Sequence, residues 1–257
     1  MRFLLGTHRP HWLGLLDVPL FVSDRTLRRY KTLPVASCDW ACDSGGFSQL
    51  SRCGTWACGP SPREYAARIR RYRDEIGRLL WAAPQDHMCE DAILARTGLD
   101  VAQHQELTIS NYLQLRSLDS ELPFIPVLQG QSIEDYHRCA DRYEQRGVDL
   151  TAVSLVGVGS ICRRQHTAEV EGVVRSLAQR GYRLHAFGAK TLGLARYADS
   201  IVSSDSLAWS FAARWEPPLA ECHGHRRCNN CVKFALRWRR KILQAIGTSG
   251  NDMTTAA

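Results

Sequence analysis

The sequence predicts an α/β protein folded as a (β/α)8 barrel, on three observations. Short apolar runs alternate with segments that begin at helix caps, and this alternation is typical of βαβ units that build a parallel sheet. Seven or eight predicted strands in 257 residues match the size of a (β/α)8 barrel. No Gly-x-Gly-x-x-Gly follows the first strand, which disfavours an open doubly wound sheet, the second possibility.

The predicted strands are short apolar runs bounded by polar residues, glycines or prolines. The first run opens the chain, and the fifth is the most compact of them. Taken in order, the runs cover residues 2–6, 19–23, 40–42, 79–83, 124–128, 152–156, 183–186 and 200–203.

The predicted helices start at recognisable caps. Ser61-Pro62-Arg63-Glu64 combines an N-cap serine, a proline at the first helical position and a glutamate in capping-box position, and residues 132–135 form a second capping box. An apolar stripe follows the first cap, and the opposite face carries arginines that are expected to be solvated rather than to bind phosphate. Further helices are predicted at about 132–145, 167–181 and 191–197, with a helical turn or loop at 24–30 and a frayed tail after 247.

The composition is that of a globular protein, with 44% hydrophobic and 23% charged residues. A net charge of +7 is compatible with a polyanionic partner but does not require one. No apolar run is long enough to span a bilayer, and the N-terminus becomes polar too soon for a signal peptide, so we expect no membrane partner and a cytoplasmic location. Reduced thiols are expected there. Cys38, Cys42, Cys53 and Cys58 fit no common zinc spacing and are interpreted as buried small hydrophobes.

Polar residues and glycines follow the predicted strands, at the point where each strand ends. In a barrel these ends converge on one face, where active sites are built. A single aspartate there is more simply a cap or turn residue, but three carboxylates and a glutamine at one rim indicate a functional site. The residues concerned are Asp43, Asp86, Gln129, Gly157, Gly159, Gly188 and Asp205.

Asp43-Ser44-Gly45-Gly46-Phe47 is the most distinctive of these segments. Two glycines after a carboxylate let the backbone turn sharply and approach a ligand closely, since glycine has no Cβ and accepts positive φ. The phenylalanine can present the face of its ring to a flat ligand. The alternative is an ordinary Gly-Gly loop, and the matching polar residues farther along the chain argue against it.

The same segment resembles the signature of the tRNA-guanine transglycosylase superfamily. Four later segments resemble the family's motifs in the family's order, and the likeness spans residues 40–231. These segments are Gln85-Asp86, Val127-Leu128-Gln129-Gly130, Val156-Gly157-Val158-Gly159 and Ser204-Asp205-Ser206. The resemblance implies a (β/α)8 barrel with a zinc module, and a pentosyltransferase that exchanges guanine in a nucleic acid for a 7-deazaguanine.

By this resemblance, Asp205 is the nucleophile and Asp43 is the general acid/base that serves the leaving and entering bases. Exchange with retention at the anomeric carbon needs two displacements, with a covalent glycosyl-enzyme between them. Asp86 accepts well from guanine-type N–H groups, and Gln129 offers both a donor and an acceptor. The other residues expected to bind the base are Ser44, Gly45, Gly46, Phe47, which stacks on it, Gly157 and Gly159. The alternative role for Asp205 is to cap residues 207–209.

The segment 222–231 has the chemistry of a zinc site, because it holds three cysteines and two histidines. Cys222, Cys228 and Cys231 are the firmest ligands, His225 is the predicted fourth, and His223 is the alternative. Four protein ligands would make the Zn²⁺ structural; reduced, unliganded thiols are the other interpretation. The spacing departs from the family pattern Cys-x-Cys-x2-Cys, since the first gap is longer and no histidine follows in the family's position.

One catalytic domain, residues 1–257, is predicted, with the zinc module at about 216–241. The chain resembles the compact superfamily members that place 7-deazaguanines in DNA, since no added RNA-binding domain is recognisable. Its expected partners are therefore nucleic acid, with DNA favoured over tRNA, and a guanine or 7-deazaguanine base. The alternatives are the same exchange on tRNA and a zinc-stabilised binding protein without catalysis, although a binder has no need of three acids facing an anionic polymer. The basic segment 233–241 is a helix packed on the barrel, a phosphate-contacting face, or both.

Overall fold

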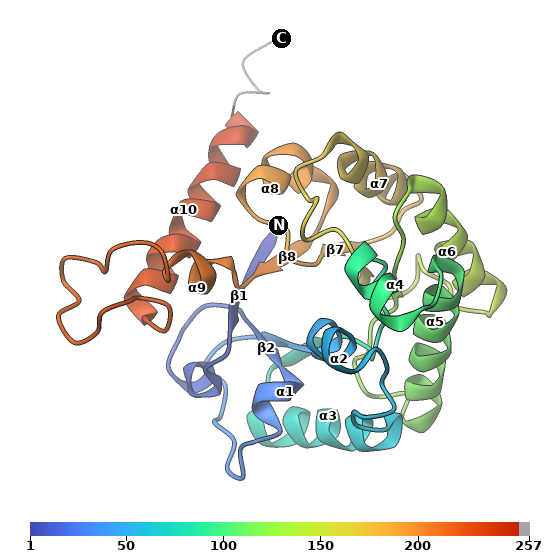
Figure 1. Ribbon diagram of the computed structural model, residues 1–257, viewed down its shortest axis with the longest axis horizontal. Coiled ribbons are helices and arrows are strands. Elements are labelled where there is room, and N and C mark those ends of the chain that lie inside the picture. The colour runs from blue at the N-terminus through green and yellow to red at the C-terminus, as the bar shows by residue number, and fades with distance from the viewer. Residues whose placement is uncertain (252–257) are drawn as a thin grey trace.

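Eight parallel strands form one curled sheet at the centre of the molecule (Figure 1). The computed structural model describes residues 1–251, and the side chains of residues 1–247. The hydrogen-bonded order is β4-β3-β2-β1-β8-β7-β6-β5, so the first and last strands of the chain are neighbours, and the predicted parallel sheet is confirmed. The strands are β1 (Arg2–Thr7), β2 (Leu20–Ser23), β3 (Trp40–Asp43), β4 (Leu79–Ala82), β5 (Val127–Leu128), β6 (Val156–Val158), β7 (Leu184–Ala186) and β8 (Ser203–Ser206).

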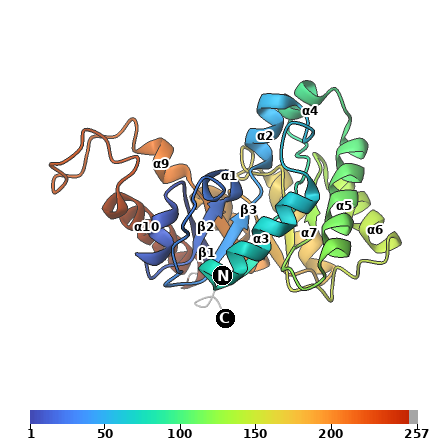
Figure 2. The ribbon, with the colours of Figure 1, turned by 90° about the horizontal axis from the view of Figure 1, so that it is seen from below.

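Helices surround this sheet. Figure 1 shows α3, α5, α6, α7, α8 and α10 around its outside, and Figure 2 shows α2 and α4 beyond the ends at which β2 and β3 finish. The helices are α1 (Asp24–Leu27), α2 (Gly46–Cys53), α3 (Pro62–Ile76), α4 (Asp91–Thr97), α5 (Val101–Leu118), α6 (Ile133–Gln145), α7 (Ala168–Gln179), α8 (Thr191–Tyr197), α9 (Ala208–Ala212) and α10 (Val232–Asn251), with short 3-10 helices η1 (Pro10–Gly14) and η2 (Ala198–Ser200).

The two edge strands, β4 and β5, approach each other without forming a ladder. Among residues 1–251 one parallel bridge spans the gap, from Ala82 of β4 to Phe124 ahead of β5. The nitrogen of Ala82 donates to the oxygen of Pro123 over 2.9 Å, and the nitrogen of Ile125 donates to the oxygen of Ala82 over 3.2 Å. The predicted strand at 124–128 shrinks to β5, because Pro126 has no N–H to give to a ladder. The observed sheet is a curled half-barrel, and the fully closed (β/α)8 barrel stays a prediction.

The predicted strand at 152–156 begins too early. The carboxylate of Asp149 accepts from the nitrogens of Thr151 and Ala152 over 2.9 and 3.2 Å, and this turn delays the start of β6 until Val156. Gly157 therefore lies within a strand rather than after one.

The predicted strand at 200–203 is also displaced, because η2 ends at Ser200 and β8 covers the next polar run. All four residues of β8 are buried, and the hydroxyl of Ser204 donates to the oxygens of Ala186 and Ala189 over 2.9 and 2.7 Å. Hydropathy cannot identify a strand whose buried side chains are polar and paired. Asp205 therefore lies inside β8 rather than just after a strand.

The predicted helix starts are confirmed. The hydroxyl of Ser61 accepts from the nitrogen of Glu64, whose carboxylate accepts from the nitrogen of Ser61, and Pro62 opens α3. Ser132 and Asp135 make the same reciprocal pair at α6. These boxes satisfy backbone donors that the first turn of a helix otherwise leaves open.

Ion pairs occupy the basic face of α3. Arg70 pairs with Asp119 at the surface, as the solvated interpretation expects. Arg68 instead donates to both oxygens of Asp24 over 2.7 and 2.9 Å, and the hydroxyl of Tyr72 donates to Asp24 over 2.9 Å. The side chain of Asp24 has no exposed area, a burial that the sequence does not indicate because Asp24 lies in a charged segment.

The interpretation of four early cysteines as buried small hydrophobes holds fully for Cys42 alone. Cys53 and Cys58 are exposed and form a disulfide, with Cα atoms 6.7 Å apart. The cause is local, because α2 ends at Gly54 with φ +68° and the chain turns back on itself. Cys42 is buried as predicted, and Cys38 is partly exposed.

The C-terminal helix α10 packs on the sheet through buried Phe234 and Ile242, and Arg239 donates to the oxygen of Phe3 over 3.4 Å. The packed-helix interpretation of 233–241 therefore holds. The helix continues to Asn251 beyond the start of the predicted frayed tail, and residues 252–257 of that tail lie outside the described residues. No helix within residues 1–251 is long and apolar enough to cross a membrane.

Candidate active site and metal cluster

A cavity of about 380 Å³ opens where the strands end, and the three predicted aspartates all line it. Asp43 comes from the end of β3, Asp86 from the loop after β4 and Asp205 from β8. Parallel strands bring residues far apart in sequence to one face in this way. Phe47 and Gly159 also line the cavity, whereas Ser44, Gly45, Gly46, Gln129 and Gly157 are not among its lining residues.

The double glycine lets α2 begin against Asp86. Gly45 is the N-cap of α2 and has φ +82°, a conformation that L side chains rarely adopt. A Cβ at Gly46 would lie 2.9 Å from Oδ1 of Asp86. The hydroxyl of Ser44 donates to that same oxygen over 3.4 Å and accepts from the nitrogen of Gly46 over 3.3 Å. The turn thus supports Asp86 from behind and leaves Phe47 40% exposed at the cavity.

A chain of hydrogen bonds fixes the side chain of Asp86. Nε2 of Gln129 donates to Oδ2 of Asp86 over 2.7 Å, and the hydroxyl of Ser160 donates to Oε1 of Gln129 over 2.5 Å. Ser160 in turn accepts from the nitrogen of Cys89 over 2.6 Å. A Cβ at Gly159 would lie 2.5 Å from Nε2 of Gln129, so glycine is required for this packing. Gln129 lies behind Asp86 and orients it.

Gly157 has a packing position rather than one on the cavity wall. A Cβ at Gly157 would lie 2.5 Å from the ring of Phe187, which does line the cavity. Gly157 is predicted to contact the base, but it is not among the residues that line the cavity. Its lack of a side chain instead leaves space for the ring of Phe187.

Burial changes the acidity of the carboxyl groups. Burial, together with the negative charge of Asp43, raises the pKa of Asp86 to about 7. Burial also raises the pKa of Asp43, and the nearby Asp205 acts in the same direction. A carboxyl group that can hold a proton near neutral pH is suited to general acid and base catalysis.

Asp205 is held by one oxygen. Its Oδ1 accepts from the nitrogen of Gly188 over 3.1 Å and from Nε2 of the fully buried His185 over 3.2 Å. Because a carboxylate only accepts, Nε2 carries the hydrogen, and Nδ1 of His185 accepts from Ser203 over 2.9 Å. The nitrogen of Ala208 donates to Ser206 instead, so Asp205 does not make the cap that was the alternative role for it. Within the described residues, Oδ2 of Asp205 has no hydrogen bond.

Several residues of the site escaped the sequence-based prediction. His185 and Ser160 carry the contacts described above, and neither belongs to a recognisable local pattern. Oε2 of Glu90 is buried at the cavity without a hydrogen-bond partner among the described residues, and burial raises the pKa of Glu90. The guanidinium carbon of Arg163 lies 5.2 Å from the ring centroid of Phe47, a cation–π contact across one side of the cavity.

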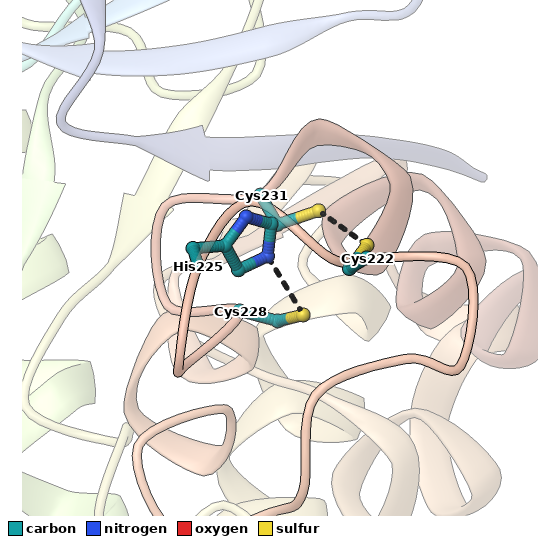
Figure 3. A group of neighbouring side chains, drawn as sticks. All are labelled: Cys222, His225, Cys228 and Cys231. Atoms are coloured by element: carbon teal, nitrogen blue, oxygen red, sulfur yellow. Dashed lines mark hydrogen bonds between the residues drawn. The ribbon is translucent and has the colours of Figure 1, made fainter.

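A second group of side chains lies in the segment between α9 and α10. Ligand atoms of Cys222, His225, Cys228 and Cys231 all lie within 4.8 Å of one another (Figure 3). The sulfur atoms of Cys222 and Cys231 are 3.6 Å apart, and Nε2 of His225 is 3.2 Å from the sulfur of Cys228. Sulfurs at about 2.3 Å from a tetrahedral zinc lie about 3.7 Å apart. The cluster could therefore hold a metal ion such as zinc, and it includes His225, the predicted fourth ligand, rather than His223.

One of the comparisons with known proteins identifies a family. No curated protein matches the chain. A family model described as DpdA, DeoxyPurine in DNA protein A, matches residues 1–256. The predicted likeness to the tRNA-guanine transglycosylase superfamily, and to its compact DNA members, is thereby confirmed. The chain belongs to the DpdA family, the DNA 7-deazaguanine transglycosylases.

Proposed function

We propose that this protein replaces guanine in DNA with a 7-deazaguanine through a covalent aspartyl-glycosyl intermediate. The family acts on DNA with a 7-deazaguanine base, which supports the polymer and the incoming base. One observation carries the mechanism: Asp205 is anchored through Oδ1 alone, so Oδ2 is available at a cavity that Asp43 and Asp86 also line.

Base recognition is assigned to Asp86 and Phe47. Guanine presents neighbouring N–H donors on one edge, and an ionised carboxylate accepts from both. Gln129 and Ser44 hold the carboxylate of Asp86 in position for this contact. The exposed ring of Phe47 gives a stacking face for the base. The target nucleotide has to leave the duplex stack to reach the cavity, at a cost of a few kcal/mol.

Two displacements complete the exchange. Oδ2 of Asp205 attacks C1′ as the bond from C1′ to the guanine breaks, and the proton of Asp43 goes to the departing base. The incoming 7-deazaguanine then gives its N9 proton to Asp43 and attacks C1′, which releases the carboxylate of Asp205. Each displacement inverts C1′, so the product keeps the original configuration.

The remaining sequence-based predictions belong to this proposal. Zn²⁺ bound by Cys222, His225, Cys228 and Cys231 would be structural, because four protein ligands leave no open position. The chain acts as a single (β/α)8-type catalytic domain over residues 1–257, with a zinc module at about 216–241, in the cytoplasm.

Incorporation of a labelled base tests the function. The protein is incubated with labelled 7-deazaguanine and either duplex DNA or tRNA, and label is counted in the recovered polymer. We expect label in DNA and none in Asp205→Asn. Label in tRNA but never in DNA would reverse the preferred polymer. Salt-sensitive binding to DNA without any label would favour the non-catalytic binding protein.

A further inference from the structure

Three large apolar side chains form an exposed stripe beside the active site. Leu207 is 42% exposed, Phe211 63% and Trp215 76%. The nitrogen of Trp215 donates to the oxygen of Ala212 over 2.9 Å, so the helical turn of α9 continues past its end. Residues spaced by four along a helical turn share one face. The rings of Phe211 and Trp215 lie 6.5 Å apart, and we call these three residues the aromatic stripe.

The aromatic stripe is continuous with the cavity. Leu207 is one of the cavity's lining residues, and it follows Asp205 by only two positions in the chain. The aromatic stripe therefore extends from Leu207, next to the strand that carries Asp205, to Trp215 on the outer surface. Figure 2 shows α9 and the segment after it projecting away from the sheet, on the opposite side from α2 and α4.

Positive charge accompanies the aromatic stripe. Arg214, Arg226 and Arg227 are exposed along the segment that contains the stripe and the metal cluster. None of these three arginines makes an ion pair with the residues that the structure describes. Some exposed arginines elsewhere do pair with carboxylates, as Arg175 does with Asp199. Exposed, unpaired arginines in the same segment as exposed aromatic rings suit a partner with phosphates and stacked bases.

We propose that the aromatic stripe holds the opened DNA duplex, by packing Phe211 and Trp215 against the bases next to the nucleotide that enters the cavity. This inference rests on the proposed function, because it takes DNA as the substrate. The unpaired arginines contact the adjoining phosphates. The aromatic side chains replace part of the stacking that the duplex loses when the target base leaves.

The activity test compares three substrates of one sequence: a matched duplex, a duplex with a mismatch at the target guanine, and the single strand. Phe211→Ala/Trp215→Ala should lower kcat/KM on the matched duplex about tenfold or more, as expected for lost stacking on bases. Because the mismatched duplex and the single strand are already open, the loss there should be at most about twofold. Leu192→Ala removes an equally exposed apolar side chain elsewhere, on α8, and should leave all three rates unchanged.

A loss of equal size on all three substrates, or no loss on the matched duplex, would overturn the proposal. A binding readout separates this outcome from failure of the proposed function. Acrylamide quenches the fluorescence of exposed Trp215, and the difference between the wild type and Trp215→Phe isolates its signal. Duplex DNA should shield that signal even if no base is exchanged. A signal that stays fully quenchable in saturating DNA would overturn the proposal, because DNA would then leave Trp215 exposed.

Discussion

The amide of Gln129 donates from Nε2 to Oδ2 of Asp86 over 2.7 Å, and this bond joins the loops that follow β5 and β4. Ser160 fixes which way the amide points, because its hydroxyl donates to Oε1 of Gln129. Asp86 is therefore oriented before any base arrives. Its buried carboxyl nevertheless retains its proton up to about pH 7, so the group that reads the base titrates within the physiological range.

Base binding should depend on pH through Asp86. The carboxylate accepts from the N–H groups of the base only when ionised, so affinity should fall as pH drops below about 7, approaching tenfold per unit. Calorimetric titration with a 7-deazaguanine between pH 5 and 8 measures this. Asp86→Asn should bind weakly and without that slope. Affinity that is constant across the range would contradict the assignment.

The same pKa predicts a change in folding stability. Because the pKa of Asp86 is higher in the folded state than in the unfolded chain, the folded state holds the proton more tightly. Asp86 therefore contributes most to the free energy of unfolding below about pH 4, and this contribution is lost as the pH rises to about 7. Asp86→Asn keeps the shape without the buried charge. The melting temperature of Asp86→Asn minus that of the wild type should therefore increase from pH 5 to pH 8. A difference in melting temperature that stays constant over this interval would mean that Asp86 is already ionised well below pH 7.

Asp205→Asn should abolish exchange while preserving the fold. An amide can still accept from Gly188 and His185 through its oxygen, so the local structure survives, but it cannot form the glycosyl ester. We expect a loss of at least about a thousandfold in rate. The wild type should form a DNA adduct that survives denaturing electrophoresis, and the variant should not. Full activity in Asp205→Asn would leave Asp43 as the next candidate nucleophile.

Removing a ligand of the metal cluster should destabilise the protein. Cys228→Ser and His225→Ala should each lower the zinc content below one per chain, together with the melting temperature, because a structural metal contributes directly to folding. His223→Ala is the matched control, since His223 lies outside the cluster. Elemental analysis and thermal melts measure both quantities. Equal effects of the two histidine changes would reopen the choice of fourth ligand.

Loss of the carboxylate of Asp24 should be costly. Asp24→Ala leaves Arg68 without its buried partner, and breaking such a pair typically costs about 3–5 kcal/mol. Asp74 pairs with Arg73 at the surface, where both side chains are well exposed, so Asp74→Ala should cost less than about 1 kcal/mol. Urea denaturation compares the two. Similar costs would mean that the pair at Asp24 does not act as a buried one.

The meeting of the three aspartates is predictable because parallel strands all end on one face. Helix starts are equally predictable from the sequence, since the capping box at Ser61 involves only residues that are close together in the chain. The displaced boundary of β8 shows what hydropathy misses: Ser204 is buried with its hydroxyl bonded to the oxygens of Ala186 on β7 and Ala189 in the loop after it. Such a strand has no apolar run to recognise.

The unforeseen parts of the site depend on contacts between distant segments. Ser160 contacts Gln129 and Cys89 in the folded protein, although both residues are far from it in the sequence. No local sequence pattern therefore indicates these contacts. His185 is likewise indistinguishable from a core residue until Asp205 lies beside it. The disulfide at Cys53 needs the left-handed turn at Gly54, which fixes the direction in which the chain returns.

Because β4 and β5 have almost no backbone pairing, the bond from Gln129 to Asp86 is one of the contacts that connect the two edges of the sheet. Within residues 1–251 one backbone bridge, from Ala82 of β4 to Phe124 ahead of β5, spans this gap. The bond from Gln129 to Asp86 adds a side-chain contact on the side of the cavity. That hydrogen bond ends on the same carboxyl group whose pKa burial raises to about 7. The residue assigned to read the base therefore also takes part in the contact between the two edges of the sheet.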